Sequence, residues 1–205
     1  RKYGTRDGVF TTEGWLGFAE VWNEAKALNQ VVMDQLVKAG IPAIAFPPCA
    51  QVKTRSHDII EWNTSPLAAT LANQLTPVIY GDVVFDDEIG GTILSTEEQF
   101  EFLSSVLRPA RILLAGVEAG IWKDFPKRKE FYPLITPENI KEVKAHLAPS
   151  ESPDVTGGMV SKVESMLRLV ENGRCREVCI FSGLEADRIL ETLGGACNGT
   201  IIRLN

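Results

Sequence analysis

The segment 154–162 combines residue types that could hold a phosphate group. It reads Asp-Val-Thr-Gly-Gly-Met-Val-Ser-Lys, and the apolar spacing that follows predicts a helix over 158–171. Gly157 and Gly158 would let a ligand approach the backbone closely, beside helix N–H groups that have no internal partner. Lys162 lies one helical turn beyond Gly158, so its ammonium group could reach back to phosphate oxygens. The pattern therefore predicts an anion site, although an ordinary helix start would read the same way.

Two further residues of this segment offer polar groups to the same site. Thr156 carries a hydroxyl at the rim, and Asp154 could orient Lys162 or another cation. The spacing is neither that of a Walker A loop, in which Lys-Ser/Thr directly follows the second glycine, nor that of a dinucleotide fingerprint. The residues alone thus indicate a phosphate site without naming the ligand.

The elements that must position this segment alternate between amphipathic helices and short apolar strands. Helices are predicted at 17–39, 65–74, 96–107, 136–147, 158–171 and 185–193, and strands at 41–46, 77–80, 111–115, 177–181 and 200–204. Residues 50–64 are predicted to be irregular, and 81–87 to form turns of a small hairpin that returns through 92–94. This alternation predicts an α/β fold, a three-layer α/β/α sandwich with a mainly parallel central sheet, as a single domain over 1–205.

Composition excludes several classes of function. The chain has 205 residues, 44% of them hydrophobic, and a net charge of -6, which gives no general reason to bind nucleic acid or an anionic membrane. No apolar run approaches the length of a membrane span, and the start does not resemble a signal peptide. We therefore expect a cytoplasmic protein. Its four cysteines (Cys49, Cys175, Cys179 and Cys197) do not have zinc-site spacing, and we expect reduced thiols.

Several segments resemble isopentenyl phosphate kinases of the amino acid kinase family. Residues 154–159 with Lys162 are similar to the nucleotide motif of that family. Residues 77–84 (Pro-Val-Ile-Tyr-Gly-Asp-Val-Val), 14–29 and 112–122 are similar to further family segments in the same order. The resemblance covers nearly the whole chain, and it implies an amino acid kinase-like fold.

The resemblance also implies a reaction and a set of roles. ATP, with Mg²⁺, would phosphorylate isopentenyl phosphate to isopentenyl diphosphate, a step of isoprenoid biosynthesis, and the protein would be a homodimer. Lys162 and Asp154 would be the catalytic residues, and no metal ligand is assigned to the chain itself. ATP would also contact Thr156, Gly157, Gly158, Val117 and Gly120, while Gly81, Asp82, Ser95 and Thr96 would belong to the acceptor site.

Two departures from the family pattern keep alternatives open. The family begins with a Lys- and Gly-rich strand and a histidine-bearing loop, about sixty residues that have no counterpart here. Val117 stands where an acidic residue is expected, with Glu118 one place away, and Ser95-Thr96 stands where Ser-Gly is frequent. A related enzyme that acts on another carboxylate, phosphonate or phosphate acceptor is one alternative. A non-catalytic nucleotide-binding or scaffold protein is another.

Three other groups of residues have both a structural and a functional interpretation. Asp82 and the acidic run 86–88 could bind a metal ion, but a solvated hairpin is the simpler interpretation. Lys123 and the basic run 127–129 could cover a nucleotide, although basic loops are commonly just solvated surface. Residues 21–22 and 93–94 could line a prenyl pocket, or they could pack in the core.

Overall fold

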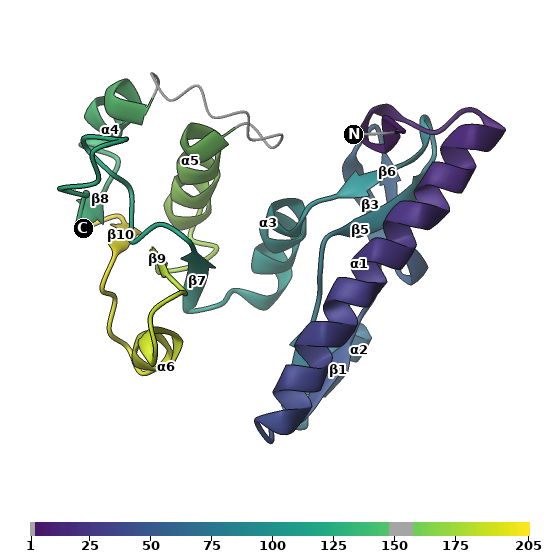
Figure 1. Ribbon diagram of the computed structural model, residues 1–205, viewed down its shortest axis with the longest axis horizontal. Coiled ribbons are helices and arrows are strands. Elements are labelled where there is room, and N and C mark those ends of the chain that lie inside the picture. Colours follow the sequence, from purple (N-terminus) through teal and green to yellow (C-terminus); the bar gives the residue numbers. More distant parts are fainter. Residues whose placement is uncertain (1–2, 148–157) are drawn as a thin grey trace. The chain divides into compact units, whose positions relative to one another are not determined.

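The computed structural model of the protein describes residues 3–147 and 158–205 (Figure 1). The chain divides into two compact units, Arg1–Phe102 and Leu103–Asn205. Helix α3 (Thr96–Leu107) begins in the first unit and ends in the second. Its bounds are those predicted from the sequence.

The first unit combines a long helix, a two-stranded sheet and a four-stranded sheet. Strands β1 and β4 pair in parallel, and the larger sheet has the order β3-β2-β5-β6. Within it β2 and β5 are parallel, whereas β2–β3 and β5–β6 are antiparallel hairpins. The elements are α1 (Thr12–Lys38), β1 (Ala43–Ala45), β2 (Val52–Arg55), β3 (Asp58–Trp62), α2 (Ser65–Ala72), β4 (Thr76–Val78), β5 (Asp82–Asp86) and β6 (Gly90–Leu94), with short 3-10 helices at Thr5–Asp7 and Pro48–Ala50.

Helix α1 has clear signals at both ends. The Thr11 hydroxyl accepts a hydrogen bond from the Gly14 N–H at 3.1 Å, so the helix begins earlier than the predicted residue 17. Gly40, just beyond the helix, has a φ of 72° and ends it. On the inner face Phe18 is buried with Val83, and residues 21–22 and 93 pack against this cluster. The described contacts therefore support core packing for these apolar residues.

The prediction that 50–64 is irregular was wrong, because this segment forms the hairpin β2–β3. Its turn residues Ser56 and His57 both have positive φ, at 47° and 73°. Their backbone N–H groups donate to the buried carboxylate of Asp86, at 3.1 and 3.0 Å. Thr54 donates its hydroxyl to the same carboxylate at 2.8 Å. A residue some thirty positions away thus stabilises the turn, and no local glycine signals it.

The second unit is a four-stranded sheet with helices around it. The strand order is β7-β9-β10-β8; β7 and β9 are parallel, β10 and β8 are parallel, and β9 and β10 are antiparallel. The expected parallel pairing is thus confirmed for β7–β9 and β10–β8, and antiparallel strand pairs accompany it in both units. The elements are β7 (Arg111–Gly116), β8 (Leu134–Ile135), α4 (Ile140–Leu147), α5 (Gly158–Glu171), β9 (Glu177–Ser182), α6 (Arg188–Leu193) and β10 (Thr200–Arg203).

Helix α5 supplies much of the core of this unit. Its residues Val163 and Met166 are at most 1% exposed, and they pack with Val178 and Ile202 of the sheet. The helix contacts β9, β10 and α4. Burial of this one apolar stripe, rather than intrinsic propensity alone, accounts for the agreement between the predicted and observed bounds of α5.

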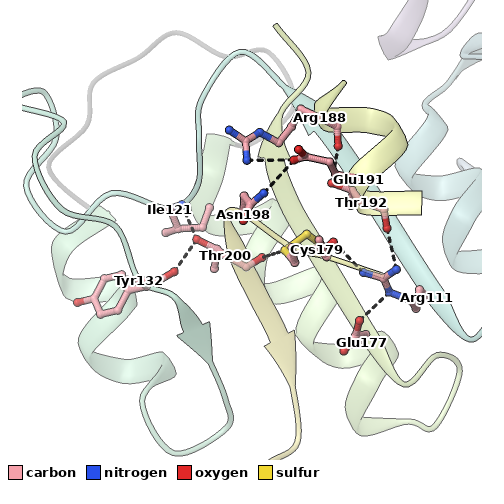
Figure 2. Close-up of a disulfide and its surroundings, with 12 residues drawn as sticks. Arg111, Ile121, Tyr132, Glu177, Cys179, Arg188, Glu191, Thr192, Asn198 and Thr200 are labelled. Atoms are coloured by element: carbon pink, nitrogen blue, oxygen red, sulfur yellow. Dashed lines mark hydrogen bonds and ion pairs between the residues drawn. A yellow bond between two sulfur atoms is a disulfide. The ribbon is translucent and has the colours of Figure 1, made fainter. Parts of the chain in front are cut away.

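The expectation of reduced thiols was wrong for two of the four cysteines. Cys179 of β9 and Cys197 form a disulfide (Figure 2). Cys49 and Cys175 are free. The antiparallel pairing of β9 with β10 places Cys179 opposite Ile201, which brings the preceding loop with Cys197 close. This contact depends on the register of two strands, so cysteine spacing in the sequence could not reveal it.

Candidate functional site

The described candidate nucleotide residues Val117 and Gly120 lie at the edge of the second unit where β7 and β9 end. The two parallel strands end side by side, with Gly116 opposite Ser182. The next residue, Gly183, donates its N–H to the Gly116 carbonyl at 2.8 Å. Loops that follow the carboxyl ends of parallel strands form the usual ligand crevice of α/β folds. The sequence prediction identified the loop after β7 but missed the loop after β9, although both strands had been predicted.

The loop after β7 is fixed at one end and open at the other. Gly120 is buried, and a Cβ there would lie 2.7 Å from the Thr200 hydroxyl oxygen and 3.0 Å from the Phe131 ring. The Thr200 hydroxyl accepts from the Ile121 N–H at 2.8 Å and donates to the Tyr132 carbonyl at 2.6 Å (Figure 2). Gly120 therefore fixes the loop by close packing.

Two apolar side chains project from these loops into solvent. Val117 is 71% exposed, and Leu184 of the loop after β9 is 74% exposed. Exposed apolar groups at strand ends can pack against a flat, weakly polar ring such as a base. Val117 is thus exposed enough for the predicted contact with ATP, and that contact would be apolar packing instead of a charge interaction.

Glu118 does not take the place of the acidic residue that the family pattern would have at the position of Val117. Its carboxylate accepts from the Trp122 indole N–H at 2.7 Å and from two nitrogens of Arg128, at 3.0 and 2.8 Å. The hydrogen bonds from Arg128 are the main reason that the pKa of Glu118 lies below its usual value. Both charges are satisfied by each other, so Glu118 serves to fold the excursion 122–135.

The basic residues of that excursion are also partly engaged. Lys123 forms an ion pair with Glu130 at 2.5 Å and lies 5.3 Å from the centroid of the Tyr132 ring. Backbone N–H groups of Lys129 and Glu130 donate to Asp124, which shapes the turn. These contacts favour a structural role over a cover for the nucleotide.

The start of α5 lies at the same edge as these loops. A short turn, 172–176, joins the end of α5 to the start of β9, and the two elements contact each other. The chain therefore reverses there, and Gly158 lies at the end of the unit where β9 finishes. Lys162, partly buried, follows Gly158 by about 6 Å of helical rise. The other predicted members of the motif, Asp154, Thr156 and Gly157, lie outside the described residues.

The candidate acceptor residues come together in the first unit. Asp82 begins β5 and pairs with Leu94, the last residue of β6. Gly81 faces the same junction, since a Cβ on it would lie 3.6 Å from the Leu94 carbonyl and from the Thr96 hydroxyl. Strand pairing thus unites Gly81, Asp82, Ser95 and Thr96, which are separated in sequence by more than a dozen residues.

Ser95 acts as the cap of α3. Its hydroxyl accepts from the Glu98 N–H at 3.2 Å, and the Glu98 carboxylate accepts from the Ser95 N–H at 2.6 Å. This reciprocal pair is a capping box. The prediction that Thr96 begins the helix is confirmed, but the cap itself is one residue earlier. The Ser95 hydroxyl is therefore occupied by the backbone.

Asp82 is a buried carboxyl group with an unsatisfied oxygen. The residue is 1% exposed, and its Oδ1 accepts from the Val83 N–H at 2.8 Å. Among the described residues, Oδ2 has no hydrogen-bond partner, and neither has the buried Oε1 of Gln99. Burial raises the pKa of Asp82 to about 6, against the hydrogen bonds from the Val83 and Cys49 backbones. The solvated-hairpin interpretation was therefore wrong for Asp82.

The rest of the acidic run is committed to structure. Burial raises the pKa of Asp86, but hydrogen bonds from backbone N–H groups of Glu88, His57 and Ile89 and from Thr54 outweigh it and hold the pKa well below its usual range. Asp87 pairs with Lys53 at 2.7 Å. Within 3–147 and 158–205, no group of three or more His, Cys, Asp and Glu side chains is placed to hold a metal ion.

Comparison with known proteins identifies the family. A sequence model of the amino acid kinase family matches residues 3–182. The isopentenyl phosphate kinase of Methanocaldococcus jannaschii is 32% identical over 186 residues, which are 91% of this chain and 67% of that protein. The enzyme of the same name from Methanothermobacter thermautotrophicus is 31% identical over 159 residues, 77% of this chain and 60% of that protein.

A solved structure supports the same assignment at the level of the fold. The chain described as "X-ray structures of isopentenyl phosphate kinase" has a TM-score of 0.79 and 26% sequence identity. The similarity covers 98% of this chain and 77% of that one. These matches confirm the predicted α/β sandwich class. The chain spans 67% and 60% of the lengths of the two curated relatives above. The protein belongs to the amino acid kinase family, and the two curated relatives described above are isopentenyl phosphate kinases.

Proposed function

We propose that this protein is an ATP-dependent phosphotransferase that converts isopentenyl phosphate into isopentenyl diphosphate. The observation that carries the proposal is the 32% identity to a protein of that name over 91% of this chain. Family membership alone would leave the acceptor open, because one fold hosts many substrates. The named relatives therefore support this substrate, and the geometry within each unit supports a division into a donor half and an acceptor half.

The donor half of the site is proposed to lie at the edge where β7 and β9 end. Lys162 would neutralise the phosphates of ATP, and Asp154 would orient the cationic side chains. Phosphoryl transfer depends mainly on positioning and charge neutralisation, so a lysine beside a helix start suits it. The remaining proposed contacts to ATP are Thr156, Gly157, Gly158, Val117 and Gly120.

The acceptor half is proposed to lie at the junction of β5, β6 and α3. Gly81 leaves space beside Thr96, whose hydroxyl could donate to a phosphate oxygen. Ser95 would contribute through its position at the helix start, because its hydroxyl caps α3. Asp82 would not contact the phosphate directly, since two anionic groups repel each other. Its unsatisfied oxygen would instead accept a hydrogen bond from a cationic or hydroxyl donor that binds the acceptor.

Mg²⁺, a homodimer and a cytoplasmic location belong to the same proposal. The Mg²⁺ ion would arrive with the phosphates of ATP, since this ion commonly binds through substrate phosphates. A search of the described helices found none that is both long and apolar enough to cross a membrane. The disulfide Cys179–Cys197 is the feature that argues against a reducing compartment. A single amino acid kinase-like domain over residues 1–205 is still a prediction.

The test is ADP release by the whole gene product, with Mg²⁺ and ATP present. Isopentenyl phosphate should support turnover, while acetylglutamate, carbamate and a phosphonate should give only the background ATPase rate. Turnover with one of the other acceptors, and none with isopentenyl phosphate, would show a different kinase of the same family. ATP binding without turnover on any acceptor would support the non-catalytic alternative.

A further inference from the structure

A pocket rich in arginine lies in the second unit, at the edge opposite the candidate nucleotide loops. Its volume is about 600 Å³. That size lies within the range of small-molecule sites. The polar part of its lining consists mainly of four arginines, one glutamate and one asparagine: Arg108, Arg174, Arg176, Arg203, Glu177 and Asn205. No part of the proposed kinase site uses these residues.

The topology of the sheet brings the arginines together. Arg108 precedes β7, Arg174 and Arg176 precede its neighbour β9, and Arg203 is the last residue of β10. Since β7 and β9 are parallel and β10 is antiparallel to β9, these three strand ends lie at one edge. The main chain fixes the pocket further, because the Arg176 N–H donates to the Ala110 carbonyl at 3.1 Å.

Most of this positive charge has no counter-charge in the described protein. Among the described residues, the solvent-exposed side chains of Arg108, Arg176 and Arg203 have no hydrogen-bond or ion-pair partner. The carboxylate of Glu177 is taken by Arg111, whose Nε lies 2.7 Å away (Figure 2). Water and salt weaken the repulsion between these exposed like charges, and a bound anion would offset what remains. This local excess of positive charge contrasts with the net charge of -6 of the whole chain.

The pocket is separate from the proposed kinase site. Strand β7 runs from Arg111, beside the pocket, to Gly116, beside the candidate nucleotide loop. Six residues of extended chain span about 17 Å. The side chain of Lys162 lies near the start of α5, whereas the pocket is lined by Gly173 and Arg174, which follow the end of that helix. A ligand in the pocket would therefore bind independently of one at Lys162.

We propose that this pocket binds a diphosphate group. Guanidinium groups match phosphate oxygens in pairs, and they are the preferred side chains for phosphate recognition. Three guanidinium groups without partners exceed what a single phosphate dianion would balance, whereas a diphosphate carries the matching charge. Apolar walls from Val170, Cys175 and Leu204 leave room for an organic group on the same ligand. The ligand is thus inorganic pyrophosphate or the ester of a diphosphate.

The test is calorimetric titration of the 205-residue chain with inorganic pyrophosphate. Wild type should bind it, and Lys162→Ala should bind it with an unchanged affinity. The double variant Arg176→Gln/Arg203→Gln should bind on the order of 100-fold more weakly, since it removes two charge-assisted contacts. Arg168→Gln, an exposed residue of α5 away from the pocket, is the matched control and should behave like wild type. ADP and isopentenyl diphosphate, titrated into Lys162→Ala, would distinguish a nucleotide from a prenyl source.

Two results would overturn the proposal. One is the absence of pyrophosphate binding by the wild-type chain, and the other is binding that Lys162→Ala abolishes while the double arginine variant retains it. Because the double variant could fail to fold, circular dichroism should accompany the titration. A readout on the unchanged protein serves the same purpose: the Nε–H NMR signals of Arg108, Arg176 and Arg203 should shift during the titration. Signals that do not move would also refute the site.

Discussion

Replacement of Thr200 by valine should destabilise the second unit strongly. The Thr200 side chain is fully buried, and its hydroxyl is the only side-chain group that joins the Ile121 N–H to the Tyr132 carbonyl among the described contacts. Valine has nearly the same shape, so the change removes two hydrogen bonds without opening a cavity. The substitution therefore measures how much these two hydrogen bonds stabilise the loop that carries Gly120.

The magnitude follows from the two groups that lose their partner. An unsatisfied buried N–H or C=O costs about 1–3 kcal/mol, and the added methyl group returns about 1 kcal/mol of apolar burial. We expect Thr200→Val to lower the free energy of unfolding by about 3 kcal/mol. Urea denaturation, followed by circular dichroism, would measure the change.

Two other threonines provide graded controls. Thr192→Val removes one hydrogen bond from a buried hydroxyl to the Arg188 carbonyl, and should cost about 1 kcal/mol or less. Thr76→Val changes an exposed strand residue and should cost almost nothing. If Thr200→Val is no more destabilising than Thr192→Val, then the link from β10 to the loop after β7 does not hold that loop in place.

Three other changes test the two halves of the site and the disulfide. Lys162→Ala should reduce ADP release by roughly 10²–10³-fold, while Lys141→Ala, an exposed lysine on α4, should retain activity; equal rates would show that the phosphate site lies elsewhere. Since the folded-state pKa of Asp82 is raised to about 6, the stability of the protein should fall as pH rises from about 4 to 6. Asp82→Asn should flatten that part of a plot of the urea midpoint against pH. The same slope in the variant and the wild type would show that Asp82 does not titrate in this range. Reduction of the disulfide frees the unfolded chain from an 18-residue loop, so it should lower the free energy of unfolding by about 3 kcal/mol. Cys197→Ser should reproduce this loss without reductant.

Long, strongly patterned elements could be predicted from the sequence. Helices α3 and α5 have the predicted bounds, because each carries an apolar stripe and a polar or glycine start. Helix α4 begins at Ile140 rather than 136, since Asn139 accepts from the Thr136 N–H at 2.9 Å and holds that turn outside the helix. Local chemistry thus decides where such a helix begins, while its periodicity decides that it forms.

Features that depend on residues far apart in the chain could not be predicted from the sequence. The hairpin β2–β3 turns at residues with positive φ that Asp86 stabilises, and the disulfide depends on the register of β9 and β10. The prediction of turns over 81–87 was wrong, because Asp82–Asp86 form strand β5 and the side chains of both aspartates are buried. A carboxylate in a strand is unfavourable unless hydrogen bonds or a raised pKa compensate, and such compensation is visible only in three dimensions.

The site residues separate into those that shape the backbone and those that can exchange charge or hydrogen bonds with a ligand. Gly120 is buried against its neighbours, and Ser95 is used by its helix cap. Their replacement should therefore change stability before it changes chemistry. Asp82 differs, because one of its oxygens has no partner among the described residues although the group is buried. A buried acceptor without a donor is costly, and an ordered water, a ligand or protonation of this carboxyl group, whose pKa is raised to about 6, would each remove that cost. We infer that identifying what donates to Asp82 is the most direct route to the acceptor.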